Sequence, residues 1–173
     1  MKLVKILMFS FGVVYLWFGI LKFFPGISPA EVLAGETIRM LTFNIIGATL
    51  GVKLLALLET VIGLACIVGF APKFTIRLII AHMICTFAPL FLMPDAVFGP
   101  EIFQLTLVGQ YILKNLVFVS ALLVVYNIVS KREDEMAKLV IGATDFAKNT
   151  SRSNPSEALA LVKKNNLKDQ DAA

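Results

Sequence analysis

The stretch FGILKFFPGISPAE, residues 18–31, joins the end of an apolar segment to the start of another helix. Lys22 lies inside the apolar run, and a Pro-Gly pair at Pro25 ends it. The Ser-Pro-x-Glu pattern from Ser28 to Glu31 is typical of a helix N-terminus, with serine as the cap and glutamate completing a capping box. We therefore expect one helix to stop near Pro25 and a second, capped by Ser28, to follow at once.

The composition around this stretch is that of a membrane protein. Of 173 residues, 58% are hydrophobic and 16% charged, whereas soluble domains carry about 25% charged residues. Residues 131–173 hold 8 basic and 7 acidic side chains, and the 130 residues before them hold only 8 and 5. We expect a membrane domain over residues 1–130 and a cytoplasmic polar tail over 131–173, partly helical or disordered.

Four apolar segments lie in the first 130 residues, at 3–24, 50–71, 74–93 and 105–129. Each has about the 20 residues that a helix needs to cross a bilayer. The sequence therefore predicts an all-α fold, a bundle of four transmembrane helices. A cleaved signal peptide is the rival interpretation of the first segment, and Lys22 within its apolar run argues against it.

Basic residues in short connections predict the orientation. They precede the first segment, flank the turn between the second and third, and follow the fourth: Lys2, Lys5, Lys73, Arg77, Lys131 and Arg132. We expect both termini in the cytoplasm and the 31–49 and 94–104 connections on the outer side.

The first outer connection has helical periodicity of its own. Its apolar residues repeat at helical spacing: Ala34, Ile38, Leu41 and Ile45. This pattern predicts an amphipathic helix in the outer interface, or a short lid over the bundle. Gly47 and Gly51 form a small-xxx-small pair that favours close helix packing. In the tail, similar spacing over 136–147 predicts one short helix, and Asn154 begins a second.

Ionisable side chains within the apolar segments are the candidate functional residues, since each costs about 2.5–3.5 kcal/mol in a membrane and usually faces other helices. With each segment centred in the bilayer and about 1.5 Å of rise per residue, Lys22 lies roughly 13 Å outward of centre and Lys53 roughly 10 Å. Lys114 lies about 5 Å outward and Glu59 near the centre. This depth order predicts an ion pair between Glu59 and Lys114.

Three lysines and one glutamate would leave an excess of positive charge, which is costly inside a membrane. The excess is removed if one lysine is neutral, or if an anion or polar head group fills the site. We therefore expect a polar pocket, open to the outer side, that takes a small anionic ligand. A quinone-like ligand also fits, with its apolar tail in lipid and its carbonyls accepting hydrogen bonds from lysine. Its expected ligand-binding residues are Lys22, Lys53, Glu59, Gln110, Lys114 and Asn115. Two alternatives stay open: Lys22 could extend outward to the lipid head groups, and Glu59 could serve only to fix helix register.

Other residues carry weaker signals. His82 is the single histidine, so a metal or haem centre with several histidine ligands is excluded within one chain, and we expect a packed, hydrogen-bonded side chain. Pro89 predicts a kink in the third segment. Tyr15 and Trp17 are expected to pack or to face lipid. No phosphate loop, nucleophile elbow, HExxH or CxxC motif is present, so the sequence has no self-contained catalytic motif.

Four stretches resemble the DoxX-like small membrane proteins: YLWFGILKF (15–23), LLETVIGLACIVG (57–69), FAPLFLMPDAVFG (87–99) and GQYILKNLVFVSALLVV (109–125). The resemblance is closest to the branch that contains the bacterial reactive-chlorine-resistance inner-membrane protein. It covers about residues 3–128 and leaves out the 131–173 tail. The matching motif residues are Trp17, Gly19, Lys22, Phe23, Glu59, Pro89, Lys114 and Asn115.

The resemblance implies a four-helix bundle in the bacterial inner membrane and a role in redox or oxidative-stress physiology. The family includes a subunit associated with a thiosulfate:quinone oxidoreductase, so quinone is the implied cofactor and a membrane partner subunit or a second copy the implied partner. A small-solute or anion transporter and a non-catalytic assembly subunit are the alternative functions.

Overall fold

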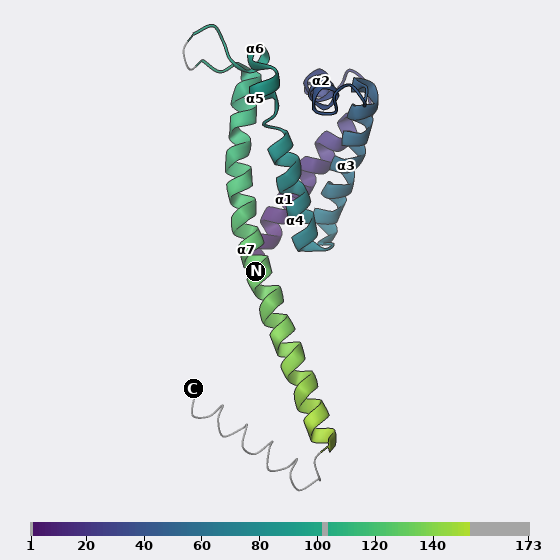
Figure 1. Ribbon diagram of the computed structural model, residues 1–173, viewed down its shortest axis with the longest axis vertical. Helices are drawn as coiled ribbons and strands as arrows, with labels where there is room; N and C mark the ends of the chain where they lie inside the picture. The colour runs from purple at the N-terminus through teal and green to yellow at the C-terminus, as the bar shows by residue number, and fades with distance from the viewer. Residues whose placement is uncertain (1, 102–103, 153–173) are drawn as a thin grey trace. The chain divides into compact units, whose positions relative to one another are not determined.

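The computed structural model describes residues 2–101 and 104–152 (Figure 1). Seven helices occur there: α1 (Lys2–Leu21), α2 (Glu31–Leu41), α3 (Ala48–Val68), α4 (Pro72–Cys85), α5 (Pro89–Leu92), α6 (Pro94–Val97) and α7 (Leu107–Arg152). The chain divides into two compact units, Met1–Val129 and Ser130–Ala173. The tail helix expected over 136–147 belongs to α7, which continues to Arg152 without interruption. The second expected tail helix, from Asn154, lies outside the described residues.

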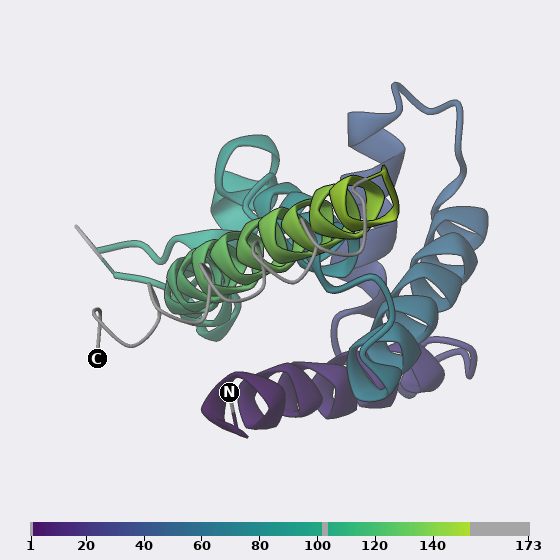
Figure 2. The ribbon, with the colours of Figure 1, turned by 90° about the horizontal axis from the view of Figure 1, so that it is seen from below.

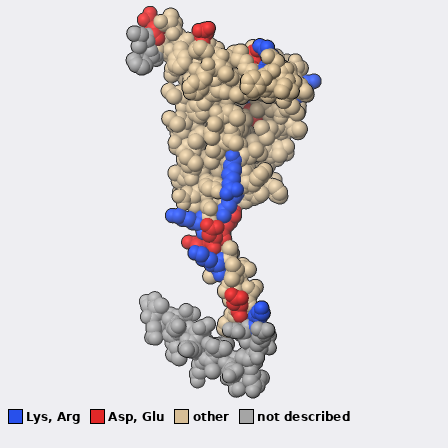
Figure 3. Space-filling model, in the orientation of Figure 1, with Lys and Arg blue, Asp and Glu red and all other residues tan. Residues whose placement is uncertain are grey.

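Four stretches are long and apolar enough to cross a membrane: Lys2–Leu21, Ala48–Val68, Pro72–Leu92 and Leu107–Lys148. Most side chains in these stretches are on the outside of the molecule, including Trp17, Leu54 and Val117. Figure 3 shows that uncharged side chains form most of one face of the first unit, with charged side chains toward both of its ends. Such an apolar exterior suits lipid and not water.

Glycines hold α1 and α3 in backbone contact. A Cβ added to Gly63 would lie 2.6 Å from the backbone nitrogen of Leu16, and one added to Gly19 would lie 2.7 Å from that of Thr60. Small residues allow this approach, which carries the packing energy between helices in lipid. The contacts also fix the register, because the last turn of α1 lies against the middle of α3.

The first half of α3 therefore extends beyond the end of α1, and α2 covers it instead. A Cβ on Gly35 of α2 would lie 3.1 Å from the Ala48 side chain, and one on Gly51 of α3 would lie 2.8 Å from that of Ile38. Figures 1 and 2 show α2 beside this end of α3. Of the predicted small-residue pair, Gly51 packs closely, whereas Gly47 meets only open space and precedes α3.

The start of α2 differs from the prediction. Its N-cap is Ala30, without a side-chain cap, and the Ser28 hydroxyl is buried with no hydrogen-bond partner among the described residues. The Glu31 carboxylate instead accepts a hydrogen bond from the Gly26 amide at 2.7 Å. Gly26 has a φ of +79°, which glycine adopts without strain. Capping by Ser28 is therefore wrong, because this turn brings the Gly26 amide to Glu31.

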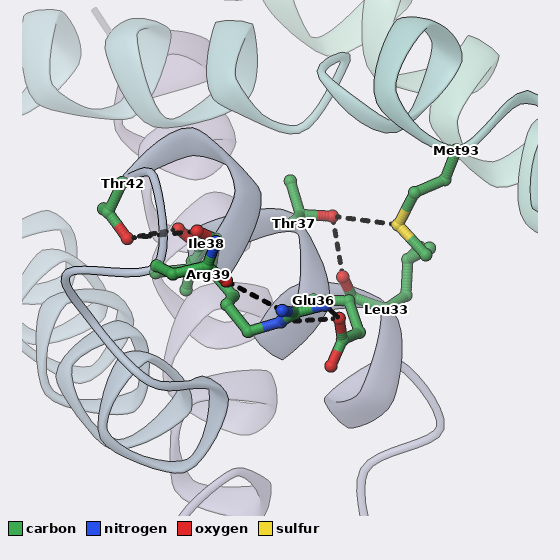
Figure 4. A network of polar contacts seen from close by, with 8 residues as sticks. Leu33, Glu36, Thr37, Ile38, Arg39, Thr42 and Met93 are labelled. Carbon is green, nitrogen blue, oxygen red and sulfur yellow. Dashed lines mark hydrogen bonds and ion pairs between the residues drawn. The ribbon is translucent and has the colours of Figure 1, made fainter.

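The remaining polar groups of α2 are satisfied largely within its own turns (Figure 4). Arg39 donates to Glu36 at 2.6 and 2.9 Å, and the Thr37 hydroxyl donates to the Leu33 carbonyl at 2.6 Å. The same hydroxyl lies 3.9 Å from the Met93 sulfur, next to α5. Thus α2 packs against α3 on one side and meets the end of the third span on another.

The third span breaks at residues 86–88, between α4 and α5, as Pro89 predicts. Proline has no N–H to donate to the carbonyl four residues earlier, and the Ala88 amide donates to the Cys85 carbonyl instead, at 3.1 Å. Asn115 of α7 donates to the Thr86 hydroxyl at 2.9 Å, so a side chain from the fourth span meets the break.

One apolar core joins the four spans. It contains two buried residues from each: Phe11 and Tyr15, Ile62 and Cys66, Ile76 and Ile79, Leu122 and Val125. Tyr15 brings a hydroxyl group into this core, and a buried hydroxyl needs a hydrogen-bond partner. The partner it finds belongs to the candidate site.

We predict that Gly63→Ala destabilises the protein, because its new Cβ would meet the backbone of α1. Overpacking of this kind costs about 1–3 kcal/mol, and it should lower the melting temperature of the purified protein in detergent. Gly142→Ala in α7 is the matched control, since nothing lies within 4 Å of a Cβ there. Equal melting of Gly63→Ala and the unmodified protein would contradict the close contact of α1 and α3.

Candidate functional site

A buried ion pair joins Lys22 to Glu59. The Lys22 Nζ lies 2.6 Å from Glu59 Oε2, and the two side chains are 5% and 8% exposed. Lys22 follows directly after α1, in a turn where its amide donates to the Gly19 carbonyl. Its Nζ is also 3.4 Å from the Phe18 carbonyl oxygen. The side chain thus points inward to α3 and not outward to lipid head groups.

The glycine contact explains this placement. Because Gly19 packs on the backbone of Glu59 and Thr60, the turn after α1 begins beside the middle of α3. A lysine three residues beyond Gly19 then reaches the Glu59 carboxylate. Thr60 leaves that carboxylate free for Lys22, since its own hydroxyl donates to the Ala56 carbonyl at 2.8 Å.

His82 and Tyr15 extend the pair into a chain of four side chains. His82 Nε2 lies 3.6 Å from Glu59 Oε1, and His82 Nδ1 lies 2.9 Å from the Tyr15 hydroxyl. The two rings pack edge to face, with centroids 5.5 Å apart. We call Tyr15, Lys22, Glu59 and His82 the polar cluster. It draws on α1, the turn after it, α3 and α4.

The charges of the polar cluster balance. One lysine faces one glutamate, and the His82 imidazole lies beside the other oxygen of the same carboxyl group. Interactions between charges are strong where water is excluded, and removal of one partner leaves an uncompensated charge. The cluster is therefore a unit in which each group depends on the next.

The predicted site residues fall into two groups. Lys22 and Glu59 meet, whereas Lys53, Gln110 and Lys114 are exposed on other surfaces. The predicted pair of Glu59 with Lys114 is wrong: Lys114 lies with its Nζ 4.8 Å from the centre of the Tyr111 ring. Gln110 donates to the Leu105 carbonyl at 3.4 Å, while Asn115 meets Thr86 at the break of the third span.

Two members of the polar cluster, Tyr15 and His82, were not among the predicted site residues. A signal for Tyr15 is present in the sequence: with Gly12, Gly19 and Lys22 it follows the three-and-four spacing of a single helix face. His82 is hydrogen-bonded, as predicted, but its spacing does not reveal which partner it meets. That information exists only in the packing of α4 against α1 and α3.

A second polar contact joins α4 to α7. Arg77 donates through Nε to the Tyr126 hydroxyl at 3.0 Å, and its guanidinium lies 5.3 Å from the centre of that ring. These side chains are partly exposed, so we regard the contact as a structural link. Cys66 is a buried free thiol and Cys85 an exposed one. Over residues 2–101 and 104–152, no group of three or more His, Cys, Asp or Glu could hold a metal ion.

Comparison with known proteins adds no relative. No family model matches the sequence, and no curated protein or solved structure matches the chain.

We predict that Lys22→Met and Glu59→Gln each destabilise the protein by about 3–5 kcal/mol, because each leaves one buried group without its partner. The double variant should lose much less than the sum, since it buries no unpaired charge. Thermal unfolding in detergent measures all three. Lys53→Met and Lys114→Met, at exposed positions, should stay within about 0.5 kcal/mol of the unmodified protein. Additive losses in the double variant would contradict the pairing.

Proposed function

We propose that this protein is a DoxX-like integral membrane protein of redox or oxidative-stress physiology that binds a quinone-like molecule at the polar cluster. The observation that carries the proposal is the buried chain from Lys22 through Glu59 and His82 to Tyr15, within segments apolar enough to span a membrane. An ionisable group in such a segment is costly, so it is a candidate functional residue by default.

The chemistry of a quinone suits this place. Its isoprenoid tail belongs in lipid, and its ring carbonyls accept hydrogen bonds from an ammonium, imidazole or hydroxyl group. The polar cluster has all three donors. Two aromatic rings of α1 lie nearby in sequence with exposed faces, Trp17 and Phe18, and Lys22 Nζ is 5.8 Å from the Phe18 ring centre. A flat quinone ring could stack on such a surface.

The residues of the four DoxX-like motifs meet in two places. Gly19, Lys22 and Glu59, which belong to two separate sequence motifs, lie in contact or next to one another in space. Pro89 and Asn115 belong to the two other motifs, and both lie at the break of the third span. The polar cluster is one of these two places.

The balance of charges favours a neutral ligand over an anion. The prediction of an anion depended on three lysines around one glutamate, but Lys53 and Lys114 are exposed elsewhere. Glu59 alone compensates Lys22. A carbonyl group can accept a hydrogen bond from Lys22 without replacing this carboxylate, whereas a small anion would compete with it. The same observation weakens an anion transporter.

We also propose the setting of this site: a four-helix bundle in the bacterial inner membrane with both termini cytoplasmic. In this orientation α2 lies at the outer interface, and the polar cluster lies beneath it, where α1 ends. The basic residues of the connections support the orientation through the positive-inside tendency. The outer half of α3, which α2 covers, then separates the cluster from the outer solution.

The proposal predicts that quinone accompanies the purified protein. Solvent extraction of protein purified in mild detergent should yield a quinone, identified by its absorbance and mass, in an amount comparable to the protein. The extract of an unrelated four-span protein purified in the same way gives the background. An extract at this background level would overturn the proposal, and a stoichiometric partner subunit in its place would favour the assembly role.

Binding can be followed through the single tryptophan, Trp17, which lies two residues from Tyr15. A short-chain ubiquinone should quench its fluorescence, and Tyr15→Phe and the double variant Lys22→Met/Glu59→Gln should weaken binding about tenfold, as expected when about 1.4 kcal/mol is lost. Lys53→Met and Lys114→Met should bind unchanged. Equal affinity in all variants would place the quinone elsewhere, and anion uptake by proteoliposomes without quinone binding would favour transport.

A further inference from the structure

We propose that His82 and Glu59 exchange a proton inside the polar cluster, and that Tyr15 is the positioning residue that sets the direction of this exchange. The inference deepens the proposed function and rests on it for the identity of the ligand alone. It starts from an order of contacts along the cluster: the Tyr15 hydroxyl at Nδ1, then His82 Nε2 facing Glu59 Oε1, then Glu59 Oε2 at the Lys22 ammonium.

The direction follows from what each imidazole nitrogen faces. His82 Nε2 points to a carboxylate oxygen at 3.6 Å, and a lone pair there would be repelled by that negative charge. A proton on Nε2 is attracted instead, so Nδ1 carries the lone pair. The Tyr15 hydroxyl, 2.9 Å away, then donates to Nδ1. A hydrogen bond to one ring nitrogen thus decides whether the other nitrogen carries a proton or a lone pair.

His82 Nε2 and Glu59 Oε1 face each other but are not hydrogen-bonded in this conformation. At 3.6 Å the two atoms lie beyond an ordinary N–H···O hydrogen bond of 2.7–3.2 Å, yet no other described group is bonded to either. A small movement of the imidazole closes this gap. Lys22, on the other carboxylate oxygen, favours the charged form of Glu59.

The transfer step conserves atoms and charge. A hydronium ion first gives its proton to His82 Nδ1 and becomes water, and in the resulting imidazolium form Nδ1–H donates to the Tyr15 oxygen. The Nε2–H bond then breaks, its electron pair stays on nitrogen, and a new O–H bond forms on Glu59 Oε1. Neutral imidazole and carboxylic acid result, and Lys22 has lost its counter-charge.

Protonation of Glu59 is coupled to the binding of a ligand. Once Glu59 is protonated, the Lys22 ammonium has N–H groups without an anionic partner, and a carbonyl group becomes a favourable acceptor. Protonation of Glu59 and binding of a carbonyl-bearing ligand then strengthen one another, because coupling between two sites is reciprocal. The site would therefore bind its ligand together with a proton.

Few other titratable groups face this exchange. From α1 and its following turn come Tyr15 and Lys22, from α3 come Glu59 and the buried Cys66, and α4 contributes His82 itself. The core residues that α7 contributes, Leu122 and Val125, are apolar. Lys53 and Lys114 are exposed, and the Lys114 ammonium lies over the Tyr111 ring.

The single histidine makes a direct test possible. Protein labelled with ¹⁵N-histidine gives nitrogen resonances from His82 alone, and their shifts report which ring atom carries the proton. We expect Nε2–H in the neutral, ligand-free protein. Tyr15→Phe should bring the two resonances closer together, because it removes the donor to Nδ1. Tyr111→Phe and Tyr126→Phe, the same change at the other two tyrosines, should leave them unchanged.

Infrared spectra of the same samples test the exchange itself. As the pH falls, the carboxylic-acid band of Glu59, assigned by its loss in Glu59→Gln, should grow over the same pH range in which the imidazole resonances change, since the pair shares its proton. Lys22→Met should show this band already at neutral pH. Circular dichroism confirms that each variant is folded.

The proposal would be overturned by a proton on Nδ1, by resonances that ignore Tyr15→Phe in folded protein, or by an imidazole and a carboxyl that titrate in separate steps. None of these measurements uses a quinone. Failure of quinone binding would therefore refute the proposed ligand without affecting the proton exchange, and the two failures are distinguishable.

Discussion

The structure depends on the contact between α1 and α3. Glycines let the two helix backbones touch, and a buried ion pair lies next to this contact. Gly12, Gly19 and Gly63 bring the backbones together, and Lys22 meets Glu59 at the level this approach defines. Packing supplies attraction between helices in lipid, and the charges penalise any other register. Together they decide where α2 must fold and which side chains of α4 reach the site.

Much of this fold is readable from the sequence because apolar length and proline carry local information. The four spans and the break at Pro89 follow from such signals. The partner of Glu59 does not follow from local signals in the sequence. The prediction centred every span at one depth, but the middle of α3 lies against the last turn of α1, so Lys22 and not Lys114 is level with Glu59. Relative depth is a property of packing between helices.

Some residues of the candidate site can be predicted from the sequence, and others cannot. One face of α1 contains Gly12, Tyr15 and Gly19 at helical spacing, and Lys22 continues that spacing in the turn after the helix. The spacing alone therefore places Tyr15 near Lys22. His82 offers no such pattern, because a single polar residue on a span does not specify its neighbour. Similarly, the motif around Ser28 predicts that a helix follows. It does not predict that Ala30 is the N-cap, nor that the Glu31 carboxylate accepts a hydrogen bond from the Gly26 amide.

The position of Lys22 also matters while the protein is being made. Its partner Glu59 is 37 residues further along the chain, which at about 5–20 residues per second means roughly 2–7 s of synthesis. A lysine at the end of its helix can spend that time among the lipid head groups. The glutamate, in the middle of its own helix, enters when the lysine is already present. Synthesis of Lys22 before Glu59 is therefore favourable, because the residue that is unpaired for a time is the lysine at the membrane edge.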